Sequence, residues 1–152
     1  MIRKTLFATA IVFASCISGS ALAAGVPATE ADAPGTSYFS FVMSGASYRD
    51  PHEFIFKTAD PVLQEKIRSI LGGAHANEQR VMGKIVLGRA EYNEAWPFHL
   101  DPDSISLFGW STEVCDAAPM EIEDNLSLVG GDFLPNNEWC PWSSRLVREV
   151  KM

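Results

Sequence analysis

The sequence predicts a single small α+β domain, in which a mainly antiparallel β-sheet packs against two helices. Three observations support this fold class. The 152 residues leave room for one domain, and 47% hydrophobic with 20% charged residues is typical of a globular chain. Segments rich in aromatic and β-branched residues occur near both ends of the chain and in its middle. Two segments with helical spacing interrupt these strands without regular βαβ alternation, which favours α+β over α/β.

Residues 1–23 have the pattern of a secretory signal peptide and precede the predicted domain. Arg3 and Lys4 are followed by an apolar stretch from Leu6 to Ile17, which is too short to span a bilayer. Ala21-Leu22-Ala23 then has the small-x-small pattern of a cleavage site. We therefore expect a secreted or periplasmic protein without a membrane span. The alternative is a lipoprotein attached through Cys16, because "FASC" approximates a lipobox.

Loss of residues 1–23 would remove two cations and no acidic residue, so the net charge would fall from −7 to −9. This charge argues against nucleic acid as a partner. Residues 24–36 contain no large apolar side chain, so we expect a flexible leader there and the folded domain over residues 37–152.

The first half of the domain predicts two strands, a helix and a third strand. "YFSFVMS" and "EFIFKT" have strand character and are separated by a polar segment, which suggests a hairpin. Asp60-Pro61 is a helix start, and Gly72-Gly73 is a helix end. The helix between them has apolar residues at helical spacing. "RVMGKIVLG" follows as a strand, with one face formed by Val81, Gly83, Ile85 and Leu87.

The second half predicts two more strands and a second helix. "SISLFGW" has strand character, and "RLVREV" is the last strand. Between them, Asp116 is a candidate helix cap with Pro119 in the first turn. Ile122, Leu126 and Val129 would form the apolar stripe of this helix, and Gly130-Gly131 would end it.

The cysteines predict one disulfide. Cys16 lies in the signal segment, so the mature chain would retain Cys115 and Cys140. In an exported protein an even pair is typical of a disulfide, and no CxxC spacing favours a metal or redox site.

The stretch "WPFHLDPDSI" is the candidate reaction centre. Asp101-Pro102-Asp103-Ser104 has the chemistry of a turn, and His99 would then donate to a backbone carbonyl. If that turn closes a hairpin, Glu113 and Asp116 would lie near His99. A histidine with two or three carboxylates suits a divalent cation or an acid–base pair. We predict no other cofactor.

The tryptophans Trp96, Trp110 and Trp142 are candidate binding residues. Exposed aromatic rings form platforms for sugars and other ligands, although tryptophans more often pack in cores. Trp139 and Trp142 flank Cys140. Ser44, Ser143 and Ser144 lack the G-x-S-x-G context of a hydrolase nucleophile.

Two long stretches resemble a known family. They are "YNEAWPFHLDPDSISLFGWSTEVCDA" and "IEDNLSLVGGDFLPNNEWCPWSSRLVREV", and "FIFKTADPVLQEKIRSILGG" upstream also fits. The chain resembles a family of mostly uncharacterised bacterial exported proteins, similar to the N-terminal domain of a cAMP-inducible slime-mould protein. The resemblance implies that His99, Asp101, Cys115, Cys140 and Trp142 occupy the family's characteristic positions. Gly109-Trp110 departs from the family pattern, in which acidic or small residues follow that strand.

Neither the residues nor the resemblance implies a specific activity. The leading hypothesis is a secreted, disulfide-stabilised binding or accessory domain for an unidentified protein or small ligand. One alternative is a small hydrolase or metal-dependent enzyme that uses His99 with the nearby carboxylates. Another is a proteinaceous inhibitor, which a protruding loop over residues 90–97 would favour.

We expect the exported protein to begin near Ala24, because the small-x-small site ends at Ala23. Intact-mass spectrometry of the exported form tests this. A mass that requires a lipid on Cys16 would contradict cleavage after Ala23.

Overall fold

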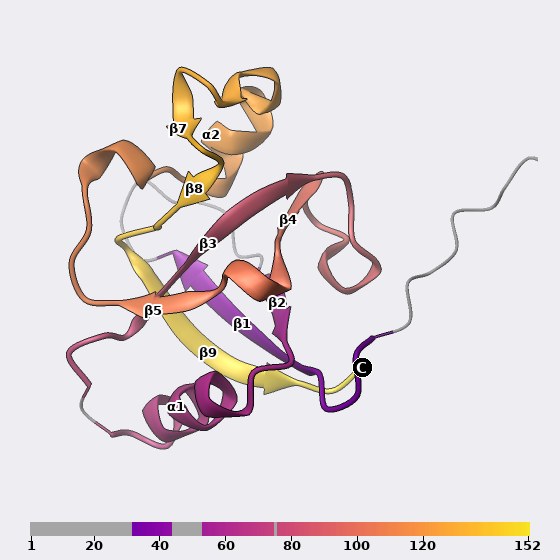
Figure 1. The fold of residues 1–152 in the computed structure, drawn as a ribbon, viewed down its shortest axis with the longest axis vertical. Helices are drawn as coiled ribbons and strands as arrows, with labels where there is room; N and C mark the ends of the chain where they lie inside the picture. Colours follow the sequence, from indigo (N-terminus) through magenta and orange to yellow (C-terminus); the bar gives the residue numbers. More distant parts are fainter. Residues whose placement is uncertain (1–31, 44–52, 75) are drawn as a thin grey trace, which may run out of the picture. The chain divides into compact units, whose positions relative to one another are not determined.

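Two antiparallel sheets, with helix α1 (Pro61–Leu71) and helix α2 (Pro119–Asp124) packed beside them, form the fold of the residues that the computed structural model describes, 32–43, 53–74 and 76–152 (Figure 1). This confirms the predicted α+β class. The predicted signal segment and most of the predicted leader lie outside the described residues. Asp32, near the end of that leader, forms an ion pair with Lys57 at 2.6 Å and accepts a hydrogen bond from the Tyr38 hydroxyl.

The first sheet has the strand order β2-β1-β9, with β2 at Phe54–Thr58, β1 at Ser37–Met43 and β9 at Ser144–Val150. Strand β1 pairs antiparallel with both neighbours, as the predicted hairpin requires for β2. Phe39, Phe41, Phe54 and Phe56 alternate along β1 and β2 and are fully buried. Alternation at a period of two explains why the sequence identified both strands.

Helix α1 spans Pro61–Leu71 and begins as predicted. The Asp60 carboxylate accepts from the amides of Val62 and Leu63, which have no partner inside the helix. The helix ends at Gly72, and Gly73 follows with a positive φ of 93°. Leu63 and Ile67 face the core.

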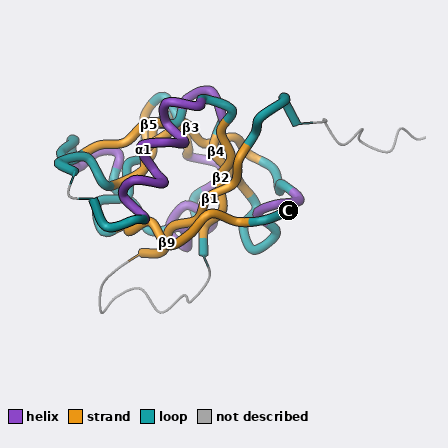
Figure 2. The backbone as a smooth tube through the Cα atoms, turned by 90° about the horizontal axis from the view of Figure 1, so that it is seen from below, coloured by secondary structure: helices purple, strands orange, loops and turns teal. Residues whose placement is uncertain are grey.

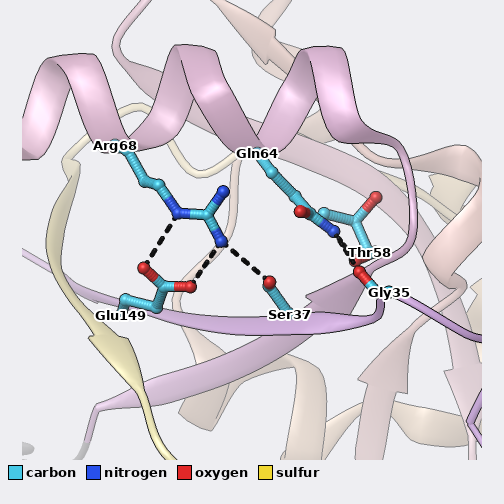
Figure 3. Close-up of polar contacts among 6 residues, drawn as sticks. All are labelled: Gly35, Ser37, Thr58, Gln64, Arg68 and Glu149. Carbon is cyan, nitrogen blue, oxygen red and sulfur yellow. Dashed lines mark hydrogen bonds and ion pairs between the residues drawn. The ribbon is translucent and has the colours of Figure 1, made fainter.

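Polar side chains attach α1 to the first sheet (Figure 3). The buried Gln64 amide donates to the backbone oxygens of Gly35 and Thr58, at 2.7 and 2.8 Å. One turn later, Arg68 forms a two-bond ion pair with Glu149 of β9 and donates to Ser37 of β1. This bond from Arg68 holds the pKa of the Glu149 carboxyl below its ordinary value. In Figure 2, β9 and β1 lie on one side of the fold and β5 (Ser106–Phe108) lies on the other.

The second sheet is built around β3, Arg80–Leu87. Strand β4 (Phe98–Leu100) and strand β5 (Ser106–Phe108) both run antiparallel to it, and β8 (Glu138–Trp139) pairs with its middle. A 3₁₀ turn, η2 at Pro102–Ser104, separates β4 from β5. The turn therefore does not close a hairpin, which was the condition for bringing Glu113 and Asp116 near His99. The turn bulges out of a strand that continues in the same direction beside β3.

The region from 109 to 135 differs from the predicted long second helix. It contains the 3₁₀ helices η3 (Glu113–Cys115) and η4 (Leu126–Leu128), the short helix α2 (Pro119–Asp124), and a parallel pair of β6 (Val129–Gly130) with β7 (Phe133–Pro135). Asp116 does not cap α2. Instead the Glu121 side chain accepts from the Ala118 amide at 2.7 Å. The buried part of the predicted β3 face ends at Ile85, because Leu87 is exposed.

One disulfide joins Cys115 to Cys140, as predicted, with the two Cα atoms 5.1 Å apart. The Cys140 amide also donates to the Cys115 carbonyl at 2.7 Å. Phe108, Met82 and Trp142 pack around the bridge in a small apolar cluster separate from the main core. The bridge therefore holds the loop after β5 against the segment that leads into β9.

We expect the double variant Cys115→Ala/Cys140→Ala to lower the free energy of unfolding by about 3–4 kcal/mol, because a loop of this length gains that much chain entropy when the bridge is absent. Urea denaturation of the oxidised protein and the variant measures the difference. Two free thiols in the oxidised native protein would contradict the bridge itself.

Candidate functional site

His99, the centre of the predicted site, lies on β4 opposite Val86. Its Nδ1 donates to the carbonyl oxygen of Gly88 at 2.9 Å, since a carbonyl can only accept. The His99 ring meets the Tyr92 ring edge-on, with centroids 6.3 Å apart. Burial raises the pKa of the Tyr92 hydroxyl, which keeps this neighbour protonated. These contacts give His99 a role in closing the β3–β4 connection.

The aspartates of the predicted site bond to backbone amides. Asp101 accepts from the Asp103 amide at 3.1 Å, which confirms the turn interpretation. Asp116, which follows Cys115, accepts from the Trp142 amide at 2.9 Å. Glu113 belongs to η3, and its side chain lies outside what the structure describes.

The strand registers separate these residues along β3. His99 lies opposite Val86, whereas Phe108, which precedes the loop with Glu113 and Asp116, lies opposite Arg80. The step of six residues from Arg80 to Val86 corresponds to about 20 Å along β3. Within residues 32–43, 53–74 and 76–152 no group of three or more His, Cys, Asp or Glu side chains is arranged to hold a metal ion. The divalent cation stays a prediction for the enzyme alternative.

The three candidate tryptophans have different environments. Trp96 is buried against Phe98 in the core, and Trp110 is 77% exposed on the loop after β5. Trp142 is half-buried beside the disulfide. The segment 90–97 turns inward rather than protruding, because Tyr92, Asn93 and Trp96 are buried in it. The Asn93 side chain ties this segment to β2 by accepting from the Ile55 amide.

A hollow lies at the corner where α1 ends and β3 and β9 begin. It has a volume of about 800 Å³. We call it the corner cavity. Its walls are formed by Ile70 and Leu71 of α1, by residues 142–147, and by Ala76, Asn77, Gln79 and Arg80. A cavity of this size is in the range of ligand pockets.

Three successive residues that line the corner cavity each have one buried polar atom without a hydrogen-bond partner in the described residues. The Trp142 Nε1 and the hydroxyls of Ser143 and Ser144 are buried and have no hydrogen-bond partner in the part of the protein that the structure describes. Ser144 as a whole is only 7% exposed. Leaving a buried donor unpaired costs about 1–3 kcal/mol, so three in successive residues require an explanation.

Arg80 and Gly109 hold the cavity walls in place. The Arg80 guanidinium donates to the carbonyl oxygens of Trp142 and Gly109, which joins β3 to the segments on both sides of the disulfide. Gly109 lies so close to the segment 76–80 that an added Cβ would be 2.1 Å from the Asn77 carbonyl oxygen. This approach explains the glycine at the position where the sequence departs from the family pattern.

The resemblance to the N-terminal domain of the slime-mould protein is confirmed by a comparison with protein families. The family model described as the BP-74 N-terminal domain matches residues 36–152. The chain belongs to this family. The match to the BP-74 N-terminal domain begins one residue before β1 and contains both cysteines and every described residue of the corner cavity. No curated protein and no solved structure matches the chain.

Among the cavity residues, sequence reasoning singled out only Trp142 as a binding candidate. Ser143 and Ser144 were considered only as hydrolase nucleophiles, and they lack the G-x-S-x-G motif. The signal that could have drawn attention to them is the unbroken polar run after Trp142, next to a half-cystine and ahead of a strand. In this BP-74 N-terminal domain the run forms the cavity wall.

We expect His99→Gln to lower the free energy of unfolding by about 0.5–1.5 kcal/mol, because the bond from Nδ1 to the Gly88 carbonyl is lost. His99→Asn is the matched control, since its shorter amide places a donor near the Nδ1 position. It should retain most of the stability in urea denaturation. Calorimetric binding of Ca²⁺ or Zn²⁺ by the wild type but not by His99→Gln would contradict a purely structural role.

Proposed function

We propose that this chain is an exported, disulfide-stabilised binding domain that takes up its ligand in the corner cavity. The carrying observation is that three successive residues lining the cavity, Trp142 to Ser144, each have a buried polar atom without a partner in the described residues. A ligand that accepts from these groups would remove the cost of leaving them unpaired. The neighbouring disulfide and Arg80 support the proposal, because they hold this wall in one arrangement before a ligand arrives.

Export of the chain is supported by the N-terminal pattern of residues 1–23 and by the disulfide, since such bonds persist in oxidising compartments. No helix in the described part is long and apolar enough to cross a membrane.

The variant Trp142→Phe tests the cavity as the binding site. It removes the indole N–H from the cavity wall and keeps an aromatic ring. Ligand-observed NMR with a mixed panel of small acids, saccharides and neutral aromatic compounds should detect binders of the wild type. We expect their affinity for Trp142→Phe to fall by about tenfold, since a hydrogen bond to a buried ligand group is lost.

Trp96→Phe is the matched control, because the Trp96 Nε1 is also buried without a partner in the described residues but lies outside the corner cavity. Its binding should equal that of the wild type. The proposal fails if no compound binds, or if the two tryptophan variants bind the panel equally well.

The variant Ser144→Ala tests independently whether the Ser144 hydroxyl is unpaired. It removes a buried hydroxyl that has no partner in the described part, so the unliganded protein should keep or gain stability, by up to about 1 kcal/mol. Ser104→Ala is the control, because that hydroxyl bonds to Lys84 and Asp101 and its loss should destabilise. Thermal unfolding of both variants measures this. A clear loss of stability in Ser144→Ala would show that its hydroxyl has a partner within the protein.

A further inference from the structure

The charge on the walls of the corner cavity is positive, in contrast to the net charge of −7 of the whole chain. Arg80 and Arg145 line it, and its described walls carry no Asp or Glu. Other arginines near α1 and β9 are neutralised, since Arg68 pairs with Glu149 and Arg148 pairs with Glu53. Neither cavity arginine has a carboxylate partner in the described part of the chain.

The hydrogen-bonding groups on these walls are mainly donors. Arg80 uses two N–H groups on backbone carbonyls, which leaves three of the five in a guanidinium. The indole N–H of Trp142 can only donate, and the two serine hydroxyls can donate by rotation. A carboxylate accepts about four hydrogen bonds and carries the charge that unpaired arginines attract.

Apolar residues also line the cavity, together with the polar side chains of Asn77 and Gln79. These apolar residues are Ile70 and Leu71 of α1 and Leu146 of β9. A second hollow of about 380 Å³ shares Ile70, Ala76 and Asn77 with the cavity and continues along α1. An inorganic anion would leave this apolar wall uncovered, whereas an acid with a hydrocarbon part would cover it.

We infer that the corner cavity binds a small organic acid. Its carboxylate lies beside Arg145 and the donors at 142–144, and its apolar part lies against Ile70 and Leu71. This inference rests on the proposed function of the same cavity and names the chemical class of its ligand.

Three probes test the class of ligand by calorimetry: octanoate, octan-1-ol and inorganic phosphate. Octanoate and octan-1-ol have the same hydrocarbon length and differ in charge, and phosphate has charge without an apolar part. We expect octanoate to bind at least about tenfold more tightly than either of the others, because only octanoate satisfies both walls.

The variant Arg145→Gln locates the carboxylate. It should weaken octanoate binding by about tenfold and leave any octan-1-ol binding unchanged. Arg89→Gln makes the same charge change at an arginine that bonds to the Glu94 carbonyl and lies outside the cavity, so it should bind octanoate like the wild type. Equal loss in both variants would indicate a general charge effect and overturn the inference.

The outcomes also separate this inference from the proposed function. Equal binding of octanoate and octan-1-ol, or binding of phosphate as tight as that of octanoate, overturns the organic acid. The organic acid is also overturned if other panel compounds bind in a way that depends on Trp142 while octanoate does not bind. In each of these cases the cavity remains a binding site, whereas a wild-type protein that binds none of the probes or panel compounds defeats both proposals.

Discussion

The packing of Trp139 is the contact on which both sheets depend. Its fully buried ring touches Phe41 of β1, Phe54 of β2 and Phe98 of β4, with centroids 4.9–5.6 Å apart. Its indole N–H donates to the Ala117 carbonyl at 2.9 Å, so the one polar atom of the side chain is satisfied. One side chain therefore fixes the distance between the two sheets, and the next residue, Cys140, fixes the loop beside them.

The sequence predicted the elements whose signals are local. Strands β1, β2 and β9 and helix α1 have clear periodicity, and α1 also has its own start and end residues. It missed β8, because two residues carry no period and this strand exists only through its pairing with Gly83 and Lys84. The predicted second helix was too long for a related reason. An apolar spacing of three to four residues fits both a long helix and the observed succession of α2, a 3₁₀ turn and a short strand.

The candidate site shows a similar division. Turn chemistry at Asp101 and the cysteine pair could be read from residue types alone, and both are present. Whether His99 and the acids would meet depended on the direction of the chain after the turn, which no local pattern specifies. The corner cavity combines the end of α1, the start of β3 and the start of β9. Such a site depends on tertiary contacts, so a sequence reveals single residues of it, such as Trp142, without their common function.

The pairing of β1 with β9 has a consequence for the order in which the protein folds. These strands lie roughly 100 residues apart in the chain, yet they form the centre and one edge of the first sheet. Pairings between distant segments are slow to form, because the chain must close a large loop before the contact stabilises it. The sheet cannot be completed until β9 has left the ribosome. Such delayed completion is compatible with the proposed export, in which the sheet and the disulfide would close only after the chain has crossed a membrane.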